Sequence, residues 1–325
     1  MKGFLLKVKK SAGRTVFLIL VAFIAAMLVT RPDRYAESAF TGLKVWAVSV
    51  LPSLLPFFFI TALLTTTGAL GSLTKVAAPV TRFLYGANGI SAFVQAISFL
   101  SGYPVGVKVA CDLKDNGVIG PLSVTKLSTF CSTSGPTFIV GSVGVAMMNS
   151  KIAGITMLCC HIAASVACGV IFRRLPCGRQ AAPLKGKTCD NVLYESVYSS
   201  VISVAIVGGF IAVFYTFACI LSDVGVFSPL TGLLSPVIGK DYAEGVAFSR
   251  IECTFACKSF STFVSPLGVA LSCGAISFGG LSVWCQSATY LIKAGADVKT
   301  FALSKLTHAV LSFVFCLTVC SITGV

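Results

Sequence analysis

Residues 99 to 117 read FLSGYPVGVKVACDLKDNG, a glycine- and proline-rich turn that leads from an apolar segment into a charged one. They overlap an uncharged run, residues 83 to 107, which the short sequences GANG, SG and YPVG interrupt. One bilayer crossing needs about 20 predominantly apolar residues, so this run is too short to cross and return as two full helices. The pattern predicts a re-entrant hairpin with its tip near Gly102 and Pro104.

The composition places this hairpin in a membrane protein. Of the 325 residues, 56% are apolar and only 11% are charged, and the mean hydropathy is +0.92. A soluble domain carries about 25% charged residues. The net charge of +14 would suggest a nucleic-acid partner for a soluble chain. Here we expect the surplus of Lys and Arg to set the orientation of the protein in the membrane.

Other stretches without Asp, Glu, Lys or Arg give a map of candidate spans. They cover residues 15 to 30, 45 to 74, 127 to 150, 152 to 172, 196 to 222, 259 to 292 and 306 to 325. Two of them contain helix breakers, STSGP at 132–136 and SCGAISFGG at 272–280. Proline removes a helical donor and glycine loosens the backbone, so we predict two broken helices. Non-helical backbone at membrane depth is tolerated only inside protein or beside a cavity. Both breaks are therefore candidate functional sites.

The order of predicted elements repeats in the two halves of the chain. In each half an apolar helix leads through an amphipathic stretch to a hairpin, a break and a plain final helix. We predict one all-α, polytopic transmembrane domain (1–325), with an N-terminal helix (1–40), a first repeat (41–173), a basic cytoplasmic linker (174–195) and a second repeat (196–325). With the N-terminus inside, the second repeat is inverted relative to the first, and most basic residues fall on the cytoplasmic side. Basic residues at the linker are Arg173, Arg174, Arg179, Lys185 and Lys187.

The N-terminal segment and the cysteines each allow two interpretations. MKGFLLKVKKSAGR followed by an uncharged run is typical of a signal peptide, but no small-residue cleavage site precedes Arg31, so we expect a retained helix. The 14 cysteines lie mostly in apolar runs and are interpreted as packing residues. Two Cys pairs have a four-residue spacing that suits metal ligands, but no His or carboxylate follows at a zinc-site spacing, so no metal is expected.

The first two groups of candidate substrate-binding residues lie in the first repeat. At the hairpin tip, glycine and proline turn the chain tightly and bring backbone amides to a ligand; the alternative is a plain turn whose lysine extends to the membrane interface. At the first break, hydroxyls, freed carbonyls and a new helix N-terminus attract an anion; the alternative is that Ser and Thr merely cap the backbone. The tip residues are Ser101, Gly102, Tyr103, Pro104, Gly106 and Lys108, and the break residues are Ser132, Thr133, Ser134 and Gly135.

The third group lies in the second repeat. Ionisable groups in a membrane segment are costly and are functional candidates by default. Glu252 either carries a coupling proton or cation, or forms an ion pair with Arg250 or Lys258. Small and polar residues after the second break either complete a polar site or pack helices together. This group comprises Arg250, Glu252, Thr254, Gly279, Gly280, Ser282 and Gln286.

The sequence contains none of the common catalytic motifs. It has no HExxH, Walker loop, GxSxG or intramembrane aspartate pair, so we expect a protein that is not an enzyme and needs no cofactor. His161 and His308 lie in ordinary helical stretches and are interpreted as hydrogen-bonded packing residues. Inverted repeats with paired broken helices are typical of secondary transporters, which bind their cargo near the membrane midplane.

Four motifs give the chain a family resemblance. They are LPSLLPFF (51–58), FLSGYPVGVK (99–108), STSGP (132–136) and ISFGGLSV (276–283). Together they resemble the sporulation integral membrane proteins of the YlbJ/SpoVV type, which carry a nucleoside-recognition or "gate" domain. Glu252 and Thr254 match the E-x-T of that family's second hairpin, although no glycine follows them. Ser132 stands where an asparagine often precedes TSGP.

The resemblance implies a cargo and a location. The cargo would be dipicolinic acid, carried across the outer forespore membrane during sporulation by alternating access. One alternative is transport of a nucleoside or another small metabolite on the same fold, and another is a non-transporting membrane protein of spore assembly. We expect an anionic small molecule and membrane lipid as partners, a possible homo-oligomer and no nucleic acid.

Overall fold

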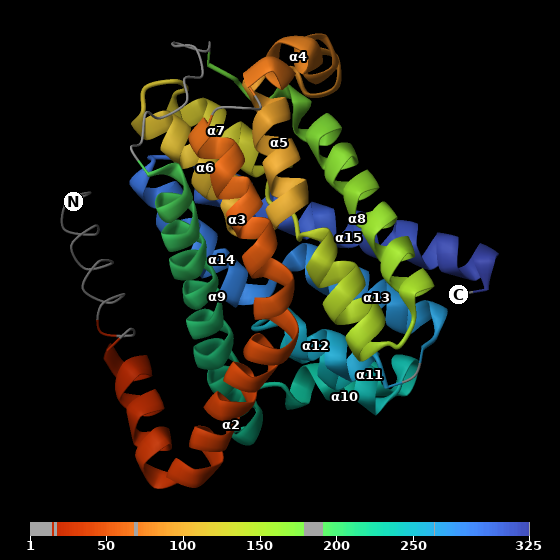
Figure 1. The fold of residues 1–325 in the computed structure, drawn as a ribbon. Helices are drawn as coiled ribbons and strands as arrows, with labels where there is room; N and C mark the ends of the chain where they lie inside the picture. The colour runs from red at the N-terminus through yellow and green to blue at the C-terminus, as the bar shows by residue number, and fades with distance from the viewer. Residues whose placement is uncertain (1–14, 16–17, 68–70, 179–190, 263, 325) are drawn as a thin grey trace, which may run out of the picture.

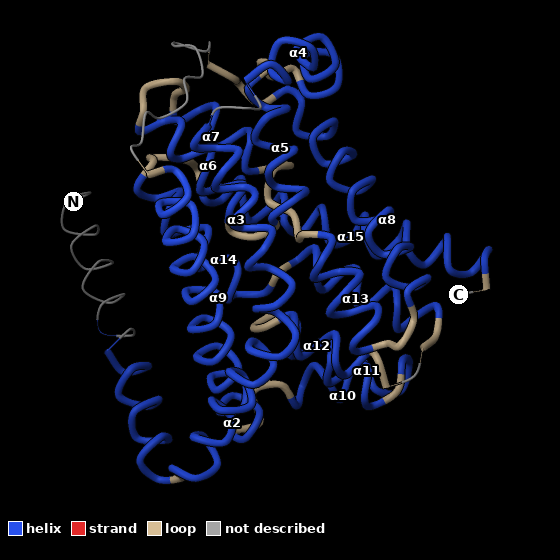
Figure 2. The backbone as a smooth tube through the Cα atoms, in the orientation of Figure 1, coloured by secondary structure: helices blue, strands red, loops and turns tan. Residues whose placement is uncertain are grey.

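The protein is all-helical where its structure is described. The computed structural model describes residues 15, 18–67, 71–178, 191–262 and 264–324, and these ranges contain no β-strand (Figures 1 and 2). The predicted all-α class is therefore confirmed.

Two sequence predictions fall partly outside the described residues. Of the predicted N-terminal helix, Leu18–Thr30 is helical, and residues 1–14 and 16–17 lie outside the description. Of the predicted linker, residues 179–190 lie outside it, and with them Arg179, Lys185 and Lys187.

The two halves of the chain contain comparable sets of helices. The first half comprises α2 (Pro32–Val45), η1 (Trp46–Val50), α3 (Leu51–Thr67), α4 (Gly71–Tyr85), α5 (Ile90–Ser101), α6 (Val105–Asp115), α7 (Pro121–Ser128), η2 (Thr137–Met147), α8 (Lys151–Ile171) and η3 (Phe172–Arg174). The second half comprises α9 (Val192–Asp223), α10 (Ser228–Ile238), α11 (Lys240–Ser249), α12 (Cys253–Phe260), α13 (Pro266–Phe278), α14 (Gly280–Lys293) and α15 (Val298–Thr323).

Several of these helices are long and apolar enough to cross a membrane. Among the described residues they are Lys151–Arg174, Val192–Asp223, Pro266–Lys293 and Val298–Thr323. A fifth candidate is the bent pair formed by residues 76–85 and α5, which meet at 87°. This set of apolar helices, with the composition, defines an integral membrane protein.

The structure contains the turn and the break that we predict in the first half. Helix α5 ends at Ser101 and α6 begins at Val105, so the turn between them falls on Gly102 to Pro104. Gly102 has a φ of +78°, a conformation that glycine adopts without strain. Helix α7 ends at Ser128 and η2 begins at Thr137, which places the first break at STSGP.

The second half contains the corresponding turn and break. Helices α11 and α12 are separated by Arg250, Ile251 and Glu252. Gly279 stands between α13 and α14 with a φ of +80°, which confirms the predicted second break.

The turns of the two halves approach the centre of the molecule from opposite ends. Figure 1 shows α4 to α7 at the upper end and α10 to α12 at the lower end. The helices of each half follow the same order: a long helix, a short helix, two arms around a turn, a broken helix and a final helix. An inverted pair of repeats would produce this arrangement, and the symmetry itself stays a prediction.

Gly106 allows the first hairpin to lie directly against the first break. A Cβ atom at this position would lie 2.1 Å from the carbonyl oxygen of Cys131 and 2.6 Å from the Cβ of Ser98. Both distances are far below van der Waals contact, so a larger residue forces the backbones of α6 and the break apart.

We predict that Gly106→Ala destabilises the protein by about 1–3 kcal/mol, the usual cost of overpacking a tight contact. The midpoint of thermal unfolding in detergent measures the effect. Gly120→Ala is the matched control, because a Cβ atom at Gly120 meets nothing within 4 Å. Equal midpoints for the two variants would contradict the assignment of Gly106 as a close-packing position.

Candidate functional site

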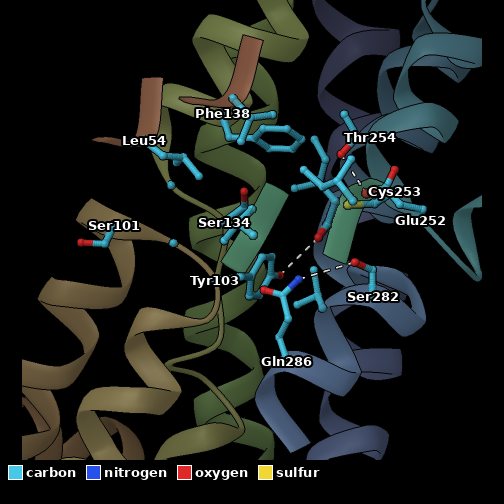
Figure 3. Close-up of a pocket in the computed structure, with 17 residues that line it drawn as sticks. Leu54, Ser101, Tyr103, Ser134, Phe138, Glu252, Cys253, Thr254, Ser282 and Gln286 are labelled. Atoms are coloured by element: carbon cyan, nitrogen blue, oxygen red, sulfur yellow. Dashed lines mark hydrogen bonds between the residues drawn. The ribbon is translucent and has the colours of Figure 1, made fainter. Parts of the chain in front are cut away.

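A small cavity lies between the two turns and the two breaks, with a volume of about 50 Å³ (Figure 3). Many of the residues that the sequence analysis singled out line this central cavity. They are Ser101, Gly102, Tyr103, Ser134, Gly135, Glu252, Thr254, Ser282 and Gln286. Its remaining lining residues are Val50, Leu54, Phe138, Val207, Ile211, Cys253, Ile276 and Val283. Ligand binding at these residues stays a prediction, but the fold brings them together from both halves.

Other predicted site residues do not line the central cavity. They are Pro104, Gly106, Lys108, Ser132, Thr133, Arg250, Gly279 and Gly280. The Nζ atom of Lys108 lies 3.7 Å from the Asp112 carboxylate beside a different cavity. Arg250 is exposed along an apolar groove. Helix geometry explains the placement of Lys108, because a few residues beyond a turn suffice to point a side chain away from its tip.

Glu252 is buried at the start of α12, where it caps the helix. Its Oε2 accepts a hydrogen bond from the Phe255 N–H at 3.0 Å, and its Oε1 accepts one from the Thr254 hydroxyl at 2.9 Å. The positive end of the helix dipole favours a carboxylate at this position. No ion pair joins Glu252 to Arg250 or Lys258, both of which are exposed. Of the alternatives for Glu252, the structure therefore excludes the ion pair.

The first break keeps its backbone groups hydrogen-bonded through side chains of other elements. The Ser98 hydroxyl donates to the Cys131 carbonyl at 2.7 Å and accepts from the Thr133 N–H at 3.2 Å. The Ser134 N–H donates to Nε2 of His161 at 2.9 Å. The polar backbone of the break is thus paired without water, as a low-dielectric environment requires.

Lys305 of α15 connects the first break to the first hairpin tip. This lysine is 1% exposed, and its Nζ donates to the Ser132 carbonyl at 2.9 Å and to the Tyr103 hydroxyl at 2.6 Å. The Tyr103 hydroxyl in turn lies 3.2 Å from the Ile276 carbonyl, to which it donates, just before the second break. A buried ammonium is costly unless hydrogen bonds compensate it, so this contact is strongly constrained.

His161 joins the two breaks from the middle of α8. Because its Nε2 accepts a hydrogen bond from the Ser134 N–H, a neutral ring carries its proton on Nδ1. Nδ1 lies 2.7 Å from the Ser277 hydroxyl, one residue before Phe278 at the end of α13. His308 donates from Nε2 to the His161 carbonyl at 3.0 Å. Both histidines are buried and hydrogen-bonded, as the sequence analysis interprets them.

The second break is paired with the second hairpin tip. The N–H groups of Leu281 and Ser282 donate to the carbonyls of Arg250 and Ile251, at 2.8 and 3.0 Å. The indole N–H of Trp284 donates to the Phe278 carbonyl at 2.7 Å. Each hairpin tip therefore contacts a break directly through hydrogen bonds or close packing.

The sequence analysis missed Lys305 as a functional candidate. A usable signal exists in the sequence, because Ser304, Lys305, His308 and Ser312 recur on one face of an otherwise apolar helix. An ionisable residue within such a face indicates a buried polar partner in the bundle.

In this conformation the central cavity contains very little space. A volume of about 50 Å³ holds a few water molecules and is too small for a metabolite. Its walls nevertheless offer a carboxylate, hydroxyls and the Gln286 carboxamide, whose Nε2 lies 3.5 Å from the Ser282 hydroxyl.

We predict that Lys305→Met lowers stability by about 1–3 kcal/mol, because the Ser132 carbonyl and Tyr103 hydroxyl lose their donor inside the protein. Methionine retains most of the side-chain length without the ammonium. Lys299→Met is the matched control, since Lys299 is exposed on the same helix. Thermal unfolding midpoints that fall equally in both variants would refute the proposed role of Lys305.

Two broken helices, two turns that meet them and a cavity at their junction belong to a polytopic integral membrane protein. Over 323 residues the chain is 28% identical to "Sporulation integral membrane protein YlbJ" of Bacillus subtilis (strain 168), with 90% of this chain and 79% of the relative covered. The protein is thus a relative of the YlbJ-type sporulation integral membrane proteins. No family model matches the chain, and no solved structure matches it.

Proposed function

We propose that the protein is a secondary transporter or facilitator that moves a small metabolite across a membrane by alternating access. The observation that carries the proposal is the central cavity, which both turns and both breaks enclose. A site held between two movable tips can be exposed to one side of a membrane at a time. Its small volume fits a state in which no metabolite is bound.

Dipicolinic acid is the proposed cargo, because the resemblance to YlbJ/SpoVV-type proteins implies it and the relative is a sporulation protein. One structural feature supports an anion. The Lys305 ammonium lies 2.6 Å from the Tyr103 hydroxyl, and Tyr103 lines the cavity. The side chain of Tyr103 therefore separates the basic group of Lys305 from the cavity. The proposed location is the outer forespore membrane, with the N-terminus in the cytoplasm.

A neutral metabolite such as a nucleoside is the second candidate. Among the described lining residues, Glu252 is the one with a charged side chain, and no Lys or Arg lines the cavity. The cations that were expected to meet carboxylates, Lys108 and Arg250, lie elsewhere. Hydroxyls and a carboxamide suit the hydrogen-bonding groups of a neutral ligand.

Uptake into proteoliposomes distinguishes these cargoes. We expect saturable uptake of labelled dipicolinate by the purified full-length protein and no uptake by empty liposomes. Saturable uptake of uridine instead would assign the neutral cargo to the same fold. Failure to take up either solute would refute the transport proposal and favour a role in spore assembly.

Glu252→Gln tests whether the buried carboxylate acts on the cargo or on a coupled proton. Glutamine preserves the shape and one acceptor oxygen for the Phe255 N–H, so we expect the variant to fold. Uptake should fall by roughly tenfold or more, because glutamine cannot take up and release a coupled proton.

Glu244→Gln is the control, because Glu244 is an exposed glutamate of the neighbouring helix α11. Its uptake should equal that of the parent protein. Full uptake by a folded Glu252→Gln variant would show that Glu252 serves only as a helix cap.

A further inference from the structure

A second cavity lies beside the first hairpin, between α3, α6 and α9, with a volume of about 150 Å³. Its walls combine apolar side chains with polar ones. They include Thr61, Lys108, Asp112, Ser199, Ser200 and Ser203. This chamber is distinct from the central cavity and shares no lining residue with it.

The two cavities lie one after the other along the interface between α3 and α9. On α3, Leu54 lines the central cavity and Thr61, seven residues later, lines the second. On α9, Val207 lines the central cavity and Ser203, four residues earlier, lines the second. Spacings of four and seven residues keep side chains on one helix face, so both helices present one continuous face to both chambers.

One pair of hydroxyls stands between the two chambers. Thr61 lines the second cavity, Ser101 lines the central cavity, and their hydroxyls are hydrogen-bonded to each other. Figure 3 shows the Ser101 side chain turned away from the other labelled residues of the central cavity. Ser101 is the last residue of α5, so the bond ties the hairpin tip to α3.

The second cavity is partly exposed to solvent. The Lys108 and Asp112 side chains retain 35% and 52% of their exposure, and they form an ion pair at 3.7 Å. On α9 the Ser203 hydroxyl donates to the Ser199 carbonyl, which leaves its oxygen lone pairs free to accept from a solute or water. These groups can form hydrogen bonds with a small polar solute, whereas the outer face of α9 carries large apolar side chains such as Val201.

We propose that the second cavity is the vestibule through which a small polar solute reaches the central cavity, and that the Thr61–Ser101 hydroxyl pair is its inner partition. The inference rests on the proposed transport function and adds an entry route to it. Moving the tip breaks this bond and joins the two chambers.

A native cysteine provides a direct test in the full chain. Cys253 lines the central cavity, and Cys257 is buried nearby without lining it. Both lie between Arg250 and Lys258, so one tryptic peptide contains them. Iodoacetamide is the probe, a small polar solute whose attachment to each cysteine is quantified by mass spectrometry.

Thr61→Ala should raise the alkylation rate of Cys253 by about fivefold to tenfold, the factor that one hydrogen bond is worth. The rate of Cys257 should stay constant. Thr67→Ala, at an exposed threonine of the same helix, should change neither rate. An unchanged Cys253 rate in Thr61→Ala, or an equal rise at Cys257, would overturn the partition.

A second variant separates this inference from the transport proposal. Ser203→Cys places a thiol in the vestibule, and Val201→Cys places one on the exposed face of α9 as a control. Attachment of a bulky, positively charged thiosulfonate should abolish dipicolinate uptake in Ser203→Cys only. Unchanged uptake after full modification of Ser203→Cys would overturn the vestibule while transport stands. If the parent protein takes up no solute, the transport proposal fails, and the Cys253 rates alone decide whether the partition exists.

Discussion

Breaking a helix at membrane depth releases backbone N–H and C=O groups that no bulk water can satisfy, and this constraint organises the whole structure. The first break is paired by Ser98, His161 and Lys305. The second is paired by the carbonyls of the second hairpin tip and by Tyr103. Because each partner must sit within hydrogen-bond distance, the breaks determine where the tips, α8 and α15 lie.

The same pairing concentrates polarity at one point of an apolar bundle. Glu252 and Lys305 are both buried, yet each is satisfied by neutral groups rather than by the other. Neutral partners hold these side chains in place. An acidic and a basic side chain therefore lie buried where the hairpin tips meet the breaks.

Local features of the fold were predictable from the sequence, and long-range partners were not. Gly102 and Gly279 mark a turn and a break because glycine accepts a positive φ. Glu252 stands out because a carboxylate in an apolar segment is rare. Lys108 and Arg250 were expected in the site from their closeness to the tips, but sequence distance does not determine the direction of a side chain. The contact from Lys305 to Ser132 joins residues 173 positions apart, and a single sequence contains no direct signal for it.

The partnership of Ser132 and Lys305 also bears on how the protein is made. The two residues are 173 positions apart, and α15 is the last helix of the chain. At about 5–20 residues per second, a ribosome needs roughly 10 to 35 seconds to reach the lysine after it has added the serine. Until then the carbonyl at the first break lacks its native donor. The centre of the first half consequently remains incomplete until Lys305 has been made and inserted.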